Sequence, residues 1–172
     1  MKIFVCGHGR HGKDEFAERL SRETDLSYVS SSYFVARKVA LPYLAKAGLF
    51  YGSVEECYDD RHNHRDLWYQ SVREFNGDDL SRLSRAIFDS HDMYVGIRDD
   101  KEFLASKDLA NFSFWVDASD RVEYRDPTCK ITEDMCDATI NNNGSLRELQ
   151  DVVEGLAIAL NVHRLQSMLA DE

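Results

Sequence analysis

The segment KIFVCGHGRHGKD, residues 2–14, indicates the fold of this 172-residue chain. After a single lysine, the residues up to position 6 form an apolar and β-branched run that stops at Gly7, which is typical of a buried strand followed by a tight turn. From position 12 to position 22, apolar residues recur at helical spacing with charged residues between them. The opening therefore predicts a strand, a glycine-rich loop and a helix, in that order.

The loop, residues 7–14, fits the pattern G-x-x-x-x-G-K and has an aspartate where serine or threonine is usual. Glycines let the backbone fold around a phosphate group, and the following helix contributes the positive end of its dipole. Because the loop lies between a predicted strand and a predicted helix, we interpret it as a nucleotide-binding loop rather than a turn without a ligand. The residues assigned to the nucleotide phosphates are Gly7, His8, Gly9, Arg10, His11, Gly12, Lys13 and Asp14.

Individual side chains of this loop have different expected roles. Lys13 can contact the outer phosphates, and Arg10 is a further candidate for phosphate binding. Asp14 can assist Mg²⁺ through water, but a carboxylate cannot duplicate the neutral hydroxyl ligand that serine or threonine supplies. We expect His8 and His11 to be exposed loop residues rather than catalytic bases.

The rest of the chain alternates between strand and helix patterns. Short apolar runs predict further strands at residues 26–29, 93–97, 112–116 and 138–141. Strands that alternate with helices imply a parallel sheet that is covered on both faces. The expected fold class is therefore α/β, as a single domain over residues 1–172.

Helical patterns occupy most of the intervening sequence. The first, over residues 33–47, is preceded by capping serines, has a bend expected at Pro42, and ends at Gly48. Residues 53–91 predict two or three helices with a break near Gly77. A shorter helical segment follows the strand at 93–97.

The C-terminal third contains an irregular segment and then a long helix. Charges, Pro127 and scattered cysteines indicate an exposed excursion or lid over residues 118–137. Ser145 is expected to cap the last, amphipathic helix. Its predicted apolar face consists of Leu146, Leu149, Val152, Val153, Leu156, Leu160 and Leu165.

Composition limits the functional classes. Lysine and arginine total 21 against 31 acidic residues, so the net charge is −10, which argues against a broad nucleic-acid-binding surface but leaves a local basic pocket open. No run approaches the roughly 20 apolar residues of a membrane span, and the start lacks the apolar stretch of a signal peptide. We expect a cytoplasmic protein with four free cysteine thiols.

These motifs together resemble those of P-loop nucleoside monophosphate kinases, especially the phage-type deoxynucleoside monophosphate kinases. Aspartate after the lysine is typical of that family and also occurs in animal-type phosphomevalonate kinase. Residues 94–103, YVGIRDDKEF, and the segments 115–121 and 137–144 are similar to further blocks of the family. The resemblance implies a three-layer P-loop kinase fold, with a helical acceptor-binding region near residues 31–91 and a lid near residues 118–137.

The resemblance also implies roles for arginines. Phosphoryl transfer depends on positioning and on positive charge around the transferred group. Arg98 follows a predicted strand, where α/β proteins place ligand residues, and we expect it to contact the acceptor phosphate. Arg121 and Arg125 resemble the lid arginines of monophosphate kinases, which reach the phosphates when the lid closes. With Lys13, these residues form the expected catalytic set.

The metal-organising acid is less clearly assigned. The family often has an aspartate near the place where Gly96 stands in this chain. Asp92, Asp99 and Asp117 are the alternatives, and each could equally cap a strand or a helix. We favour Asp99 as a catalytic acid that holds Mg²⁺ through water together with Asp14.

Two clusters are assigned to the acceptor. Aromatic side chains can stack on a base while an arginine binds its phosphate. The first cluster follows the second strand, and the second cluster recurs at helical spacing. Their members are Ser31, Ser32, Phe34 and Arg37, and then Arg61, Arg65 and Trp68. Asn141 and Asn142 resemble the family segment that passes near the donor adenine.

The resulting hypothesis is transfer of the γ-phosphoryl group of ATP, with Mg²⁺, to a nucleoside or deoxynucleoside monophosphate, in the host cytoplasm if the protein is phage-encoded. No general base is needed, because the second pKa of a phosphate is about 6. Two alternatives stay open: a kinase acting on a hydroxyl, such as a hydroxymethylated base in phage DNA, and a nucleotide-binding switch. The expected partners are small nucleotides, with nucleic acid only as an alternative acceptor, no membrane, and a monomer or a homodimer.

Overall fold

The computed structural model describes residues 1–170 and contains a five-stranded parallel sheet in the order β2-β3-β1-β4-β5. The strands are β1 (Ile3–Cys6), β2 (Tyr28–Ser30), β3 (Met93–Val95), β4 (Phe112–Asp117) and β5 (Ala138–Asn141). The predicted α/β class and its parallel sheet are confirmed. Because every strand runs the same way, the loops that follow the strands gather at one edge of the sheet.

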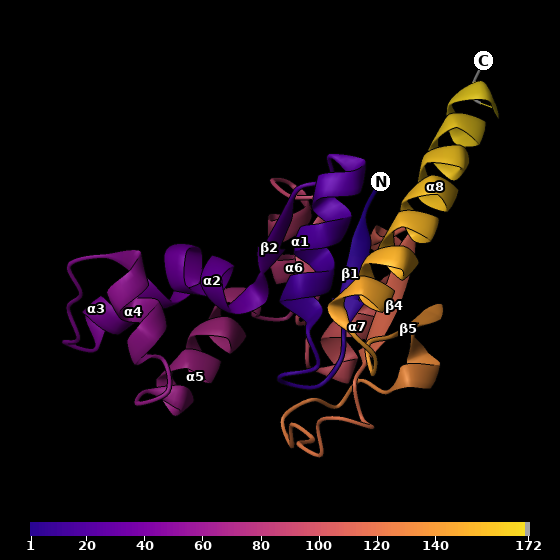
Figure 1. Cartoon of the computed structure of the whole chain (residues 1–172). Coiled ribbons are helices and arrows are strands. Elements are labelled where there is room, and N and C mark those ends of the chain that lie inside the picture. The colour runs from indigo at the N-terminus through magenta and orange to yellow at the C-terminus, as the bar shows by residue number, and fades with distance from the viewer. Residues whose placement is uncertain (171–172) are drawn as a thin grey trace.

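Helices cover both faces of the sheet and give three layers (Figure 1). The side chains of β1 alternate between two cores, with Ile3 and Val5 in one and Phe4 and Cys6 in the other. The first core includes α1 (Lys13–Thr24) and α8 (Leu146–Ala170). The second core includes α2 (Ser31–Val35), α3 (Leu41–Lys46), α4 (Val54–Asp60), α5 (Arg65–Asn76), α6 (Arg82–Phe88) and α7 (Asp100–Ser106). Of these, α3, α4 and α5 extend outward beyond β2 (Figure 1).

The helix expected over residues 33–47 is continuous but irregular. A π-helical segment, Ala36–Ala40, joins α2 to α3, and Pro42 stands in the first turn of α3. Proline has no N–H group, and its ring excludes the carbonyl group four residues earlier. The predicted bend at Pro42 therefore takes the form of a widened helical turn immediately before it.

The last helix begins as predicted but is buried over less of its length. At its start, the Ser145 N–H donates to Glu148 Oε2 at 2.6 Å, and the Glu148 N–H donates to Ser145 Oγ at 3.3 Å. Leu149, Val153, Ala157 and Leu160 are buried, whereas Leu146, Val152 and Leu165 are exposed by 61, 40 and 58%. These three positions of the predicted apolar face are therefore not part of the core. Leu165 lies in the C-terminal half of α8, which projects past the sheet (Figure 1), whereas Leu146 is the first residue of the helix and Val152 lies at the border of its buried face.

Three further features complete the description of the fold. Residues 118–137, between β4 and β5, contain one short 3₁₀ turn, Glu133–Met135, and are otherwise irregular. No helix within residues 1–170 combines the length and apolar character that crossing a membrane requires. All four cysteines are free thiols.

Candidate active site

Two positions of the loop between β1 and α1 have surroundings that only glycine tolerates. Gly7 and Gly12 have φ angles of 136° and 87°. A Cβ atom at Gly7 would lie 2.6 Å from the carbonyl oxygen of Val116, and one at Gly12 would lie 2.3 Å from Nδ2 of Asn142. Any side chain would push the loop away from β4 and from the segment after β5. The glycine spacing of the motif therefore follows from close packing behind the loop.

His11 supports the loop from behind, so the expectation that it is exposed is wrong. Its side chain is 1% exposed, and its Nδ1 accepts the N–H of Ala118 at 3.0 Å. The carbonyl oxygen of His11 accepts Nδ2 of Asn142 at 2.8 Å. Burial lowers the pKa of His11, although Asp117 opposes the shift. A buried neutral imidazole stiffens the loop and cannot serve as a cationic phosphate ligand. His8 is half-buried, and burial lowers its pKa as well.

Lys13 begins α1 and folds back over the loop, where its Nζ donates to the carbonyl oxygen of His8 at 2.7 Å. Burial lowers the pKa of Lys13, the nearby Asp14 opposes this shift, and the charge of Arg98 lowers the pKa further. Asp14 itself is exposed in the first turn of the helix. Lys13 and Arg98 thus bring two positive charges to one place, an arrangement that suits an anionic ligand.

A cavity of about 510 Å³ opens beside this loop, at the carboxyl ends of β2 and β3. Gly96, a residue of the cavity wall, lies next to the loop, because a Cβ atom at Gly96 would lie 3.7 Å from Cε of Lys13. We call this cavity the arginine pocket. Its lining consists of Ser31, Ser32, Arg61, His62, Arg65, Trp68, Tyr69, Val72, Arg73, Leu83, Tyr94, Gly96, Ile97, Arg98, Asp99, Glu102, Pro127, Thr128 and Lys130.

The arginine pocket combines cationic and apolar walls. Trp68, Leu83 and Tyr94 contribute buried apolar surface. The cationic members are Arg61, Arg65, Arg73, Arg98 and Lys130. A ligand with a flat, uncharged part and an anionic part matches both walls.

The structure brings together most of the residues that the sequence assigned to an acceptor. Ser31 and Ser32 line the pocket, with Ser31 Oγ donating to the carbonyl oxygen of Gly96 at 3.0 Å. Arg65 and Trp68 project from α5, whereas Arg61 lies in the turn before that helix. The guanidinium group of Arg61 stacks on the ring of Tyr58, with its carbon 3.8 Å from the ring centroid.

Two residues of the first cluster lie elsewhere. Phe34 is 6% exposed, belongs to the core and contacts the ring of His91 at a centroid distance of 6.3 Å. Arg37 is exposed and does not line the pocket. Phe34 belongs to α2 and packs into the core before the π-helical segment begins, whereas Arg37 lies within that segment.

The pocket also contains residues that the sequence analysis missed. Arg73 follows Arg65 by eight positions, two helical turns later on the same face, so periodicity could have found it. Glu102 and Lys130 come from α7 and from the segment between β4 and β5. No local pattern places these two beside α5.

Arg98 is held by the irregular segment rather than by its own neighbours. Its Nη1 lies 2.7 Å from Oδ2 of Asp126 and donates to Oγ1 of Thr128 at 3.0 Å. Asp126 is buried, with 6% of its surface exposed. Burial opposes ionisation of Asp126, but hydrogen bonds from Thr128 and the charge of Arg98 hold its pKa below the usual range. The segment 118–137 is therefore fastened over the pocket by an ion pair.

One carboxyl oxygen of Asp99 is used to cap a helix. It is the N-cap of α7, and its Oδ1 accepts the backbone N–H groups of Lys101 and Glu102 at 3.0 and 3.1 Å. Its Oδ2 lies 3.9 Å from Nζ of Lys130. Because Asp99 also lines the arginine pocket, its second oxygen stays close to any ligand there.

The other two acids are less suited to a metal role. Asp92 precedes β3, at the opposite edge of the sheet, and accepts both the N–H and the Oγ of Ser27. Asp117 ends β4 but accepts hydrogen bonds from Ser119 and Asn143. Asp92 is therefore no longer a candidate for the metal-organising acid, and the carboxyl group of Asp117 is used in hydrogen bonds that hold the segment after β4.

The lid arginines and the asparagines have separate positions. Arg121 lies beside the loop, where its Nε donates to the carbonyl oxygen of Asn142 at 2.6 Å. The buried side chain of Asn142 supports His11, so it does not face outward toward a base. Asn141 Oδ1 accepts from its neighbour Asn143, and Arg125 is exposed.

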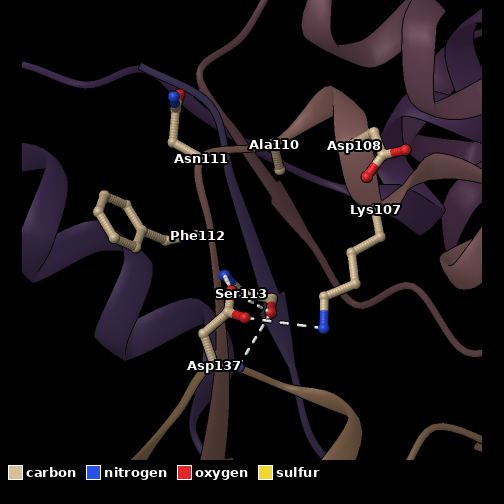
Figure 2. Close-up of a pocket in the computed structure, with 7 residues that line it drawn as sticks. All are labelled: Lys107, Asp108, Ala110, Asn111, Phe112, Ser113 and Asp137. Carbon is tan, nitrogen blue, oxygen red and sulfur yellow. Dashed lines mark hydrogen bonds and ion pairs between the residues drawn. The ribbon is translucent and has the colours of Figure 1, made fainter.

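A second cavity, of about 300 Å³, lies near the amino ends of β4 and β5. Figure 2 shows that Ser113, Asp137 and Lys107 point toward one another there. The N–H and Oγ of Ser113 both donate to Asp137 Oδ2 at 2.7 Å, and Nζ of Lys107 lies 3.6 Å from Oδ1. This cavity is on the edge of the sheet away from the phosphate-binding motif, and two of its charged residues, Lys107 and Asp137, are paired with each other.

No protein-family model matches the chain, and no curated protein matches it significantly. Solved structures do resemble it. Shikimate kinase from Aquifex aeolicus is 14% identical with a TM-score of 0.50, covering 96% of this chain and 99% of that one. The protein TT1252 from Thermus thermophilus is 12% identical with a TM-score of 0.54, covering 93% of this chain and 97% of that one. At this identity the likeness concerns architecture, and the chain has the three-layer α/β fold of P-loop kinases.

Proposed function

We propose that this protein transfers the γ-phosphoryl group of ATP to a nucleoside or deoxynucleoside monophosphate. The observation that carries the proposal is the meeting of the phosphate-binding motif with the arginine pocket. Gly96 belongs to the pocket wall, and a Cβ atom there would lie 3.7 Å from Cε of Lys13. A mononucleotide has a phosphate for the cationic wall and a base for the apolar wall. Its phosphate would then lie near the phosphates held by the loop.

The chemistry needs two phosphates brought together and their charge compensated. The low pKa of Lys13 reflects burial and the nearness of Arg98, so a phosphoryl group between these cations relieves their repulsion. In this structure Lys13 bonds to the His8 carbonyl oxygen, a contact that a nucleotide phosphate would replace. The acceptor needs no general base, since its phosphate is largely ionised near neutral pH.

ATP would bring Mg²⁺, which neutralises charge on the phosphates and needs only one or two protein carboxylates. The available oxygen donors fit that requirement. Asp14 is exposed beside Lys13, and Oδ2 of Asp99 takes no part in the α7 cap. We assign these two carboxylates to water-mediated contact with the ion.

The class of acceptor within this proposal is deoxynucleotide. The GKD form of the loop and the resemblance to phage-type deoxynucleoside monophosphate kinases favour it. Arg121, Arg125 and the segment 118–137 would close over the phosphates and exclude water. Asn141 would lie near the donor adenine, with Asn142 contributing only its support of the loop.

The test is a transfer assay with the full chain, ATP, Mg²⁺ and a panel of ribo- and deoxynucleoside monophosphates, in which chromatography follows ADP and new diphosphate. Lys13→Ala is expected to lower the rate by about a hundredfold or more. Lys38→Ala, a change at an exposed lysine, is the control and is expected to leave the rate unchanged. Binding of ATP without conversion of any monophosphate would contradict the proposal and favour the nucleotide-binding switch.

A further inference from the structure

One wall of the arginine pocket carries a half-buried carboxyl group, that of Glu102 on α7. The surrounding pocket surface includes Trp68, Leu83 and Tyr94, which are exposed by only 9, 3 and 2%. A carboxyl group in such surroundings is costly unless it is hydrogen-bonded. The hydrogen bonds that the two oxygens of Glu102 make therefore indicate which ligand groups the pocket can bind.

One oxygen of Glu102 is already paired. Asn76, the last residue of α5, is 3% exposed, and its Oδ1 accepts the backbone N–H of Leu83 at 3.0 Å. Because that N–H can only donate, the amide orientation is fixed, and Nδ2 donates to Glu102 Oε1 at 2.8 Å. The other oxygen, Oε2, makes no hydrogen bond or ion pair within residues 1–170. A buried amide thus holds Glu102 in place, and this residue of the pocket wall keeps one carboxyl oxygen available to a ligand.

The pKa of the Glu102 carboxyl group lies near neutral pH. Burial raises its pKa to about 7, the charge of Asp99 adds to the rise, and the bond from Asn76 opposes it. A ligand N–H that donates to the free oxygen would favour the ionised form and restore the bond lost on leaving water. A ligand without such a donor would leave the acceptor unpaired, which is how buried polar groups discriminate between ligands.

Among bases, the exocyclic amino group suits this acceptor better than the imide N–H of uracil or thymine. An imide N–H lies between two carbonyl oxygens, whose partial negative charges would approach the carboxylate. An exocyclic amino group has two N–H donors and no flanking carbonyl oxygen, and in cytosine one of these donors lies beside C5–H rather than beside a ring nitrogen. Resting on the proposed function, we infer that Glu102 selects monophosphates whose base carries an exocyclic amino group, such as cytosine or adenine, over their carbonyl counterparts.

The test uses matched pairs that differ mainly in amino against carbonyl: deoxycytidine with deoxyuridine monophosphate, and deoxyadenosine with deoxyinosine monophosphate. Calorimetric binding to the wild-type chain is expected to favour the amino member of each pair by at least about tenfold. Glu102→Gln is isosteric but places an amide NH2 donor where the free oxygen stood, because its carbonyl oxygen must accept from Asn76, so it is expected to abolish or reverse the preference. The control Glu74→Gln removes the same charge from an exposed position of α5 and is expected to keep the preference.

A pH series adds a readout that packing alone would not change. As pH rises through about 7, more Glu102 is ionised, so the wild-type preference for the amino member is expected to grow. In Glu102→Gln it is expected to stay flat. The titration of the ligand phosphate is common to both members of a pair. The other charged or titratable groups of the pocket remain in both proteins: Arg61, His62, Arg65, Tyr69, Arg73, Tyr94, Arg98, Asp99 and Lys130.

Binding and transfer are measured on the same samples so that two failures can be told apart. Equal affinity for both members of the pairs in the wild type, or a preference that survives in Glu102→Gln, would overturn the inference while transfer still supported the kinase. A preference that depends on Glu102 without any transfer would support the inference and overturn the proposed reaction. Absence of binding by every monophosphate would overturn both.

Discussion

At the scale of single residues, Gly12 and Gly48 have nearly the same backbone conformation in different surroundings. Their φ angles are 87° and 85°, but a Cβ atom at Gly48 would meet nothing within 4 Å, whereas one at Gly12 would lie 2.3 Å from Asn142 Nδ2. Alanine at either position costs about 1–2 kcal/mol for the left-handed conformation. Gly12→Ala is expected to cost about 1–3 kcal/mol more and to abolish ATP binding, because it displaces the amide that supports the loop.

Urea unfolding and ATP titration of the two variants check this prediction. Gly48→Ala serves as the control for backbone conformation, and we expect it to bind ATP like the wild type. If both variants lost the same free energy of unfolding and both bound ATP, close packing behind the loop would not be the reason for glycine at position 12.

The residues that could be predicted from the sequence are those whose chemistry is local. Gly7, Gly12 and Lys13 lie within the same short loop, so their spacing in the sequence alone indicates a phosphate-binding loop. The arginine pocket differs, because α5, the end of β3 and the segment near Lys130 meet only in the folded chain. Glu102 could not be placed there by pattern, since helical spacing says which face it shares but not what that face meets.

At the scale of elements, the contact between Asp126 and Arg98 fastens the segment 118–137 over the pocket. Asp126→Asn removes the charge, so we expect trypsin to cut after Arg121 or Arg125 several-fold faster near pH 7. The exposed Asp120→Asn in the same segment is the control and is expected to change nothing. Equal digestion of all three proteins would show that the ion pair does not hold the segment.

The pH dependence of this contact follows from the pKa of Asp126, which lies below its usual range in the folded chain. A carboxyl with a depressed folded-state pKa contributes stability above its unfolded pKa of about 3.9, and this contribution is lost as pH falls through the lower value. The wild-type segment is therefore expected to stay closed near neutral pH and to loosen only below about pH 4. Digestion with an acid protease on either side of that pH checks the expectation.

Element boundaries were predictable where a local cap or breaker sets them, as at Ser145, but the extent of burial was not. Hydrophobic spacing in α8 continues through Leu165, yet burial stops after Leu160 because the sheet beneath the helix ends. Periodicity describes the helix face and carries no information on the size of the surface that the helix covers. The same limit explains why Pro42 predicted a bend without predicting the π-helical segment before it.

At the scale of the whole molecule, positive charge is gathered in one place. Arg61, Arg65, Arg73, Arg98 and Lys130 line the arginine pocket, which leaves 16 basic residues against 29 acidic ones elsewhere in the sequence. A nucleic-acid duplex requires cations spread along several phosphates, whereas a mononucleotide requires them at one. The net charge of −10 therefore favours a small acceptor over a polynucleotide.

This distribution predicts how affinity depends on salt. Each neutralised phosphate of duplex DNA contributes about −0.9 to the slope of log affinity against log salt, so five pocket cations set an upper limit of about 5 on its magnitude. We expect fluorescence anisotropy to detect no saturable binding of a duplex near 0.15 M salt, while mononucleotides bind with a shallow slope. Tight duplex binding with a slope steeper than about 5 would require cations outside the pocket. It would then favour the alternative in which the acceptor is a hydroxylated base within DNA.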